Sequence, residues 1–144
     1  MKGIAFVNLA NNQGLNIMKN KYIRNLLFGL LAWLIPFLAS FLFYTKEGKL
    51  TIDILFFKSI MLVVGSISAA FLLIFYFKKI DTGYFKEGII VGVFWFVLNI
   101  LLDLLVLVPM SGMSVPNYLM QIGLGYLAIP AMSVTVGTAL ANKK

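Results

Sequence analysis

The sequence predicts an all-α membrane protein with four transmembrane helices in an antiparallel up-down bundle. Of its 144 residues, 61% are hydrophobic and 12% are charged, and the mean hydropathy is +0.97, whereas a soluble domain is about 45 to 50% apolar. A helix needs about 20 apolar residues to cross a hydrocarbon core of about 30 Å. We therefore expect one membrane domain, residues 21–144, with spans at about residues 26–44, 54–77, 88–108 and 118–140.

The first 20 residues form a polar lead that is rich in asparagine. It lacks the apolar run of about 7 to 15 residues that follows the basic start of a signal peptide. We expect residues 1–20 to be a disordered lead that is not cleaved.

The first two spans differ in their polar content. Residues 26–44 carry no charge and contain Pro36, which we expect to kink the helix or to free a carbonyl group. A polar loop, residues 45–53, leads into the second span, where Lys58 lies near the start and Gly65 and Ala69 belong to a patch of small residues. Small residues let a neighbouring helix approach closely in a membrane.

The third and fourth spans each carry a predicted packing face. Gly88 and Gly92 are one turn apart in the third, and Ser133 and Gly137 are one turn apart in the fourth. Residues 109–117 hold two prolines and one glycine, which indicates a tight or partly re-entrant turn. We expect Pro130 to break the fourth span.

Basic residues predict the orientation, because lysine and arginine concentrate in cytoplasmic segments. The lead, the central loop and the tail share one side and hold nine bases, against two, Lys46 and Lys49, on the other side. The nine are Lys2, Lys19, Lys21, Arg24, Lys78, Lys79, Lys86, Lys143 and Lys144. Both termini are therefore predicted inside, in the cytoplasmic membrane of a prokaryote.

This orientation places polar side chains from all four spans near the outer leaflet. Asp103 is the acidic residue set well inside a span, and a charge at a helix centre costs about 2.5 to 3.5 kcal/mol, so it needs a partner. Lys58 is the candidate; alternatively Lys58 snorkels to the headgroups and Asp103 is a protonated packing group. The predicted polar cluster consists of Ser40, Lys58, Asn99, Asp103 and Gln121.

Several classes of chemistry lack the residues they need. The chain has no histidine and no cysteine, and it has no GxxxxGK[ST], GxGxxG or HExxH pattern. Only Asp103 is deep enough for an intramembrane carboxylate pair, which needs two. We expect no enzyme activity, no cofactor and no metal. The bases flank apolar spans, so their partner is the lipid bilayer and not nucleic acid.

Two functions remain. The first is a non-enzymatic module whose polar cluster binds a small ligand, a lipid headgroup or a partner helix near the outer leaflet. The alternative is a small channel or transporter that uses Asp103 and Lys58, since ionisable residues within a membrane often mark pathways. The alternative requires a homo-oligomer, because four short helices rarely enclose a route.

A set of strings along residues 18–140 also resembles a family of short, uncharacterised prokaryotic four-helix membrane proteins. The strings are Gly29 with 33–37 (WLIPF), Glu87-Gly88, Gly92, Trp95, Asn99, Leu102-Asp103, 121–123 (QIG), Tyr126 and Ile129-Pro130. The resemblance implies the four-helix architecture, and it carries no activity or residue role.

Overall fold

A computed structural model of the chain describes residues 2–143, which are helical apart from short connections. Four helical segments are long and apolar enough to cross a membrane: Asn20–Phe43, Ile54–Phe77, Tyr84–Ser111 and Gly123–Ala141. This agrees with a multi-pass helical membrane protein, and the second span has the predicted bounds. The side chains of Lys2 and Lys19, and all of Lys144, lie outside the described part.

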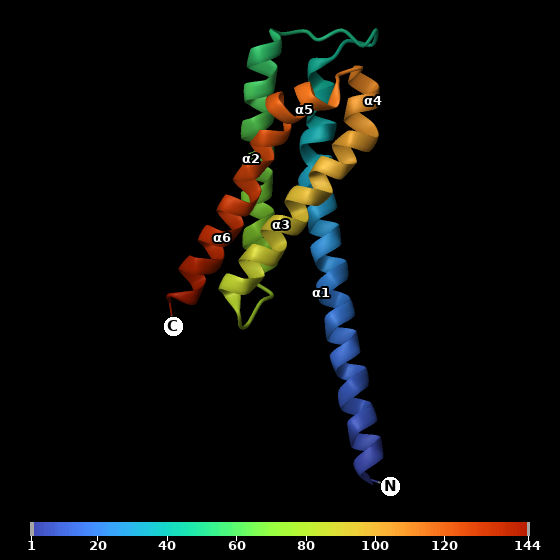
Figure 1. Cartoon of the computed structure of the whole chain (residues 1–144), viewed down its shortest axis with the longest axis vertical. Coiled ribbons are helices and arrows are strands. Elements are labelled where there is room, and N and C mark those ends of the chain that lie inside the picture. Colours follow the sequence, from blue (N-terminus) through green and yellow to red (C-terminus); the bar gives the residue numbers. More distant parts are fainter. Residues whose placement is uncertain (1, 144) are drawn as a thin grey trace.

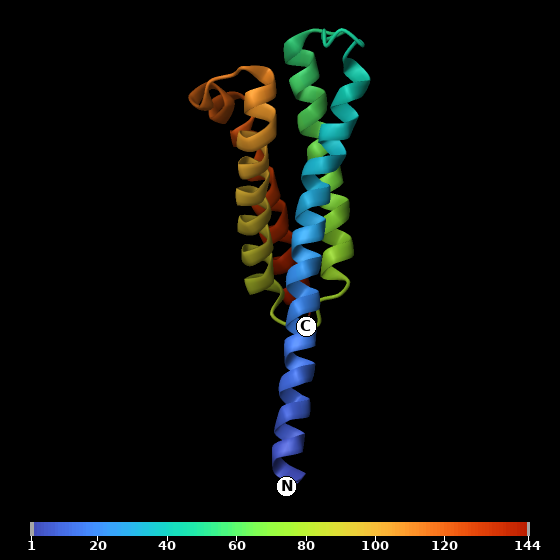
Figure 2. The same ribbon diagram turned by 90° about the vertical axis from the view of Figure 1, so that its right-hand side faces the viewer.

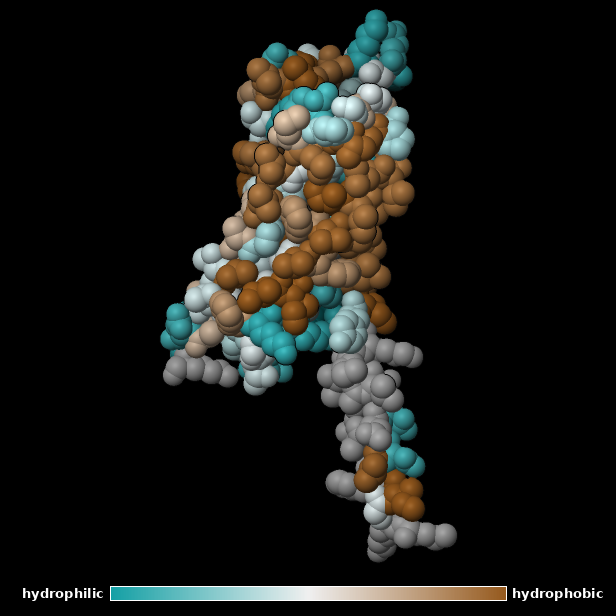
Figure 3. Space-filling model, in the orientation of Figure 1, coloured by the Kyte–Doolittle hydropathy of each residue, from teal (hydrophilic) through white to brown (hydrophobic). Residues whose placement is uncertain are grey.

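The long helices run alternately in opposite directions (Figures 1 and 2). They are α1 (Lys2–Ser40), α2 (Ile54–Phe77), α3 (Tyr84–Leu102) and α6 (Ala128–Ala141). Helix α1 contacts α2 and α3, while α6 contacts α3 and α2, so the four close into a ring. Apolar residues cover the middle of the bundle, and hydrophilic residues gather towards its two ends (Figure 3). The end that holds the C-terminus is called the inner end below, after the predicted orientation.

Helix α1 extends further towards the N-terminus than the expected first span. It begins at Lys2, so the polar lead is drawn as helix that extends beyond the bundle (Figure 1), where we expected no regular structure. Ile4 and Val7 are exposed there. The helix is also continuous through Pro36 and ends at Ser40, followed by the 3₁₀ turn η1 (Phe41–Phe43).

Helix α2 begins where Asp53 caps it. The first backbone N–H groups of a helix have no partner within the helix. One Asp53 carboxylate oxygen accepts from the N–H groups of Leu55 at 2.9 Å and Phe56 at 3.1 Å. The sequence TID before an apolar run therefore sets the outer end of this span.

Helices α3 and α6 approach each other closely because glycines line the contact. A Cβ atom on Gly88 would lie 2.7 Å from the Ser133 carbonyl oxygen, and one on Gly92 would lie 2.7 Å from Pro130 Cα. A Cβ on Gly137 would lie 2.5 Å from the Tyr84 oxygen. The two faces of small residues expected on separate spans thus pack against each other, and Ser133 Oγ donates to the Gly88 oxygen at 2.7 Å. Gly65 does not allow such a close approach, because a Cβ atom on Gly65 would lie 4.0 Å from its nearest neighbours, the side-chain atoms of Pro36.

The third span continues past its predicted end. After α3 the chain forms the π-helical segment η2 (Asp103–Leu107) and the short α4 (Val108–Ser111). The Val108 N–H donates to the Asp103 oxygen, five residues back. Pro109 has no N–H and its ring crowds the preceding turn, and a π turn widens that turn. The helix therefore passes through Pro109 and ends at Gly112, whose φ is +65°.

The fourth span is interrupted, but not at the predicted residue. Helix α5 (Val115–Gln121) ends at Ile122, whose φ of −126° and ψ of −51° leave the helical region, and the 3₁₀ segment η3 (Gly123–Leu127) follows. Gly123 and Gly125 are poor helix formers. Pro130 lies in the first turn of α6, where its missing N–H has no helical partner to lose. The prediction of a break at Pro130 is therefore wrong.

Candidate functional site

The Asp103 carboxylate is buried, with 2% of the residue exposed. Trp33 Nε1 donates to Oδ1 at 2.7 Å. The hydroxyl groups of Tyr118 and Tyr126 donate to Oδ2 at 2.9 and 2.8 Å. Both oxygens of this acid are thus hydrogen-bonded, and all three donors are neutral.

These donors come from segments far apart in the sequence. Trp33 lies on α1 and stacks on Phe37 with ring centroids 4.6 Å apart. Tyr118 lies on α5 and Tyr126 on η3, on either side of the break at Ile122. Asp103 therefore holds the folded-back outer segment of the fourth span against α1 and α3. Neither the tryptophan nor the tyrosines were candidates from the sequence, because aromatic residues are common throughout the chain.

Lys58 does not pair with Asp103. Its Nζ donates to Gln121 Oε1 at 2.5 Å, which joins α2 to the end of α5. The Lys58–Asp103 ion pair considered from the sequence is therefore not formed. The two residues have a similar depth along their helices, but depth does not determine the direction in which a side chain points. Asp103 instead accepts hydrogen bonds from Trp33, Tyr118 and Tyr126.

The other two members of the predicted cluster lie elsewhere. Ser40 Oγ donates to the Phe37 carbonyl of its own helix at 2.6 Å. Asn99 is fully buried, and its Nδ2 donates to the Trp95 carbonyl at 2.7 Å and, at 3.5 Å, to that of Gly29. Asn99 Oδ1 is buried and accepts no hydrogen bond. The five residues thus divide into a Lys58–Gln121 pair, a buried acid, a buried amide and a serine bonded to its own helix.

A second buried acid lies at the inner end of α3. Glu87 is 4% exposed and forms an ion pair with Lys21 of α1. The Tyr76 hydroxyl of α2 donates to its other oxygen at 2.6 Å, and Arg24 lies 5.0 Å from the Tyr76 ring centre. Sequence reasoning placed Glu87 in the charged loop. The sequence does contain a signal that Glu87 belongs to the bundle. Glu87 precedes Asp103 by four steps of four residues, which places both acids on the same side of a helix.

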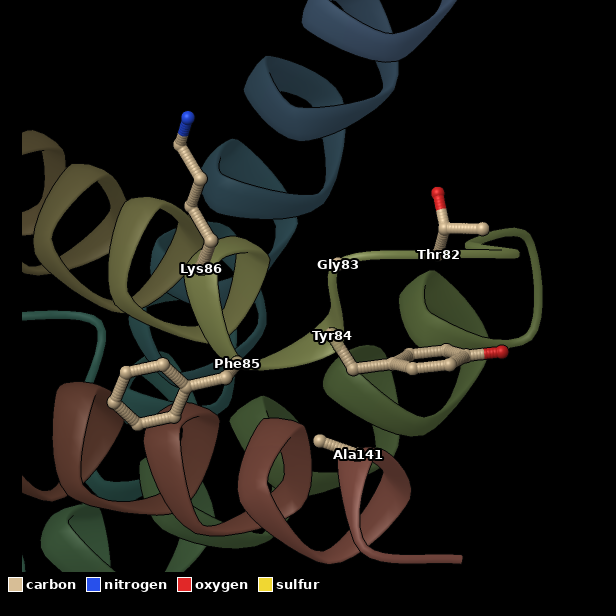
Figure 4. Close-up of a pocket in the computed structure, with 6 residues that line it drawn as sticks. All are labelled: Thr82, Gly83, Tyr84, Phe85, Lys86 and Ala141. Atoms are coloured by element: carbon tan, nitrogen blue, oxygen red, sulfur yellow. The ribbon is translucent and has the colours of Figure 1, made fainter. Parts of the chain in front are cut away.

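A hollow at the inner end does not gather these groups. It lies between the start of α3 and the end of α6 (Figure 4), where Tyr84 and Lys86 extend away from each other. The lining residues are Thr82, Gly83, Tyr84, Phe85, Lys86 and Ala141. Diverging side chains and an apolar lining make it a weaker candidate than the Asp103 site.

Comparisons with known proteins add no family. No family model matches the chain, and comparison with curated proteins and with solved structures gives no match. Within residues 2–143, no group of three or more histidine, cysteine, aspartate or glutamate side chains is placed to hold a metal ion. The resemblance drawn from the sequence strings remains a prediction.

Proposed function

We propose that the protein is a non-enzymatic membrane module whose outer end binds an anionic group at Lys58, on a platform that Asp103 holds in place. The observation that carries the proposal is that the Lys58 ammonium group and the Asp103 carboxylate belong to separate contacts and do not form a pair. Asp103 is fully hydrogen-bonded and buried, whereas Lys58 is half-buried and has a neutral partner. An ammonium group has three donors, and Gln121 uses one of them.

The depth of Lys58 favours a lipid phosphate as the ligand. Lys58 is four residues from the start of α2, which corresponds to about 6 Å along the helix. A long side chain at that depth reaches the headgroup layer. Gln121 is exposed beside it, and its amide N–H₂ offers two further donors. The proposed ligand is therefore the phosphate of an anionic lipid in the outer leaflet.

The arrangement of acids supports a role without catalysis. General acid-base pairs and carboxylate dyads act on one substrate from both sides. Asp103 and Glu87 lie at opposite ends of α3, about 24 Å apart along the axis. They are too distant to share a reacting group.

Thermal unfolding in detergent with added lipid tests the proposal. Lipid that binds the folded protein raises Tm in proportion to ln(1 + [L]/Kd). We expect phosphatidylglycerol to raise Tm more than phosphatidylcholine does, and Lys58→Met to remove the difference. Lys46→Met, which deletes a charge from the exposed loop on the same side, is the matched control and should keep it. Equal shifts with the two lipids, or a difference that survives Lys58→Met, would contradict the proposal.

A further inference from the structure

A file of buried residues runs along α3 between the two acids. Every fourth residue from one end to the other is buried: Glu87 at 4%, Val91 at 0%, Trp95 at 0%, Asn99 at 0% and Asp103 at 2% exposed. Residues four apart form a continuous ridge on a helix. Four of these five side chains carry a polar group.

Neighbouring helices add polar groups beside the one apolar member, Val91. Tyr76 Oη of α2 donates to Glu87, and the Tyr76 ring lies edge-on to Trp95 with centroids 6.1 Å apart. Asn25 Oδ1 of α1 accepts from Trp95 Nε1 at 2.7 Å. Asn25 is 7% exposed. Polar groups from neighbouring helices therefore lie at the Glu87 level, on α2, and at the Trp95 level, on α1.

Asn99 is the member whose bonding is incomplete. Its amide nitrogen is bonded, but Oδ1 is buried and unpartnered. Leaving a buried acceptor without a partner costs about 1 to 3 kcal/mol, and buried water commonly satisfies such groups. Asn99 lies between Trp95 and Asp103, one turn from each. A water bonded to Asn99 Oδ1 would therefore lie between the levels of Trp95 and Asp103.

From this file we propose that the protein conducts protons through the interior of the single bundle. A proton enters at the Glu87 carboxylate, passes through the hydroxyl of Tyr76 and waters at the Asn25 and Asn99 levels, and reaches the Asp103 carboxylate. It leaves along the hydroxyl of Tyr126, which is half-buried at the outer end. Each transfer moves one proton from donor to acceptor, and no covalent bond between heavy atoms changes.

The two ends of the proposed route differ in their charged groups. Lys21 pairs with Glu87, and Arg24 lies over the Tyr76 ring, so cations surround the inner acid. Among the described residues, the side chains that donate to Asp103 are the neutral groups of Trp33, Tyr118 and Tyr126. The cations of the route therefore lie at its inner end. This route needs neither an oligomer nor Lys58.

Proton flux into liposomes tests the proposal. Purified protein is reconstituted into vesicles that hold a pH-sensitive dye, and a potassium diffusion potential set by valinomycin drives protons inward. We expect wild-type vesicles to acidify several-fold faster than protein-free vesicles. Asp103→Asn and Asn99→Leu should bring the rate to the protein-free level, while Lys46→Met, in the exposed loop between α1 and α2, should retain the wild-type rate. Gel filtration and helicity of each variant show that it is folded.

The wild-type measurement decides the matter even if a variant fails to fold. A wild-type rate equal to that of protein-free vesicles would overturn the proposal. A wild-type rate unchanged by Asp103→Asn would assign the leak to another route and would also overturn it. Equal Tm shifts of the wild-type protein with the two lipids, together with proton flux, would overturn the lipid proposal alone, so the two proposals fail separately.

Discussion

The two halves of α3 hold their neighbours by different means. The inner half packs backbone against backbone on α6, with Gly88 and Gly92 allowing the approach. The outer half uses one side chain, Asp103, to bind three segments. In a membrane, where lipid removes the hydrophobic force between helices, close packing and interhelical hydrogen bonds are the two contributions available. The inner half combines close packing with interhelical hydrogen bonds from Ser133 and Tyr76, whereas the outer end relies on the hydrogen bonds of Asp103.

The acids at the two ends of α3 show the same division. Glu87 has a cationic partner, Lys21, whose side chain is 42% exposed. Asp103 has only neutral aromatic donors. Lys21 can exchange its partner for solvent, whereas the buried Asp103 has no replacement for its three bonds. Substitutions at the outer end should therefore be more damaging.

The largest effect is expected for Asp103→Ala. Interhelical hydrogen bonds in membranes contribute about 0.6 kcal/mol each and at most about 1.7, so losing three should lower the free energy of unfolding by about 2 to 5 kcal/mol. Glu87→Ala, the matched change at the inner end, should lose about 1 to 2 kcal/mol, because it removes one interhelical hydrogen bond, from Tyr76, and an ion pair whose Lys21 partner can turn to water. Reversible unfolding in mixed detergent micelles measures both. A loss in Glu87→Ala as large as that in Asp103→Ala would remove the distinction between the ends.

Gly92→Ala is expected to come next. Its new Cβ would meet the Pro130 backbone at 2.7 Å, and such overpacking costs about 1 to 3 kcal/mol. Gly65→Ala is the control, because the nearest atoms lie 4.0 Å away and alanine favours a helix over glycine by about 1 kcal/mol. The same unfolding assay should show destabilisation of the first variant alone. Equal behaviour of the two would mean that backbone contact does not hold the inner half.

Tyr118→Phe should have a moderate effect. It removes one of the two donors to Asp103 Oδ2 and leaves the ring in place, so we expect a loss of about 1 kcal/mol. Proteolysis near Ile122 should also become faster, because α5 is then held less firmly. Tyr22→Phe on the exposed side of α1 is the control, and it should change neither quantity. Unchanged proteolysis in Tyr118→Phe would show that α5 does not depend on Asp103.

The smallest effect is expected for Lys21→Met. A partly exposed ion pair contributes about 0 to 1 kcal/mol and weakens with salt. Wild-type stability should therefore fall slightly between 0.05 and 0.5 M NaCl, and Lys21→Met should lose that dependence. Asp103→Asn should keep it, since no cation contacts Asp103. If the salt dependence disappeared in Asp103→Asn instead, the ion pair that salt screens would involve Asp103 at the outer end and not Glu87, which would contradict this prediction.

The sequence predicts the spans and the packing residues better than it predicts the partners. Long apolar runs and glycine spacing act locally, so they reveal the four helices and the faces of α3 and α6. Partners depend on the direction in which a side chain points. Lys58 and Asp103 share a depth, yet they belong to separate contacts because Trp33 and the two tyrosines reach the acid first. Glu87 was hidden because it follows Lys86 in a charged run.

The break in the fourth span shows a second limit. Pro130 is the conspicuous residue, but a proline in the first helical turn loses no hydrogen bond. The two glycines beside Ile122 were the better signal, and they are also typical of close packing. The π turn at Asp103–Leu107 has a similar origin, since Pro109 alone does not reveal whether a helix ends or widens.

The 3₁₀ segment η3 also bears on how the shortest span fits the bilayer. The fourth span has 19 residues, against 24 to 28 in the others. At about 1.5 Å per α-helical residue and about 2.0 Å per 3₁₀ residue, α6 and η3 together extend about 31 Å, close to the hydrocarbon thickness of about 30 Å. An entirely α-helical segment of the same length would be about 2 to 3 Å shorter. Winding those five residues more tightly therefore lengthens the last span towards the thickness of the hydrocarbon core.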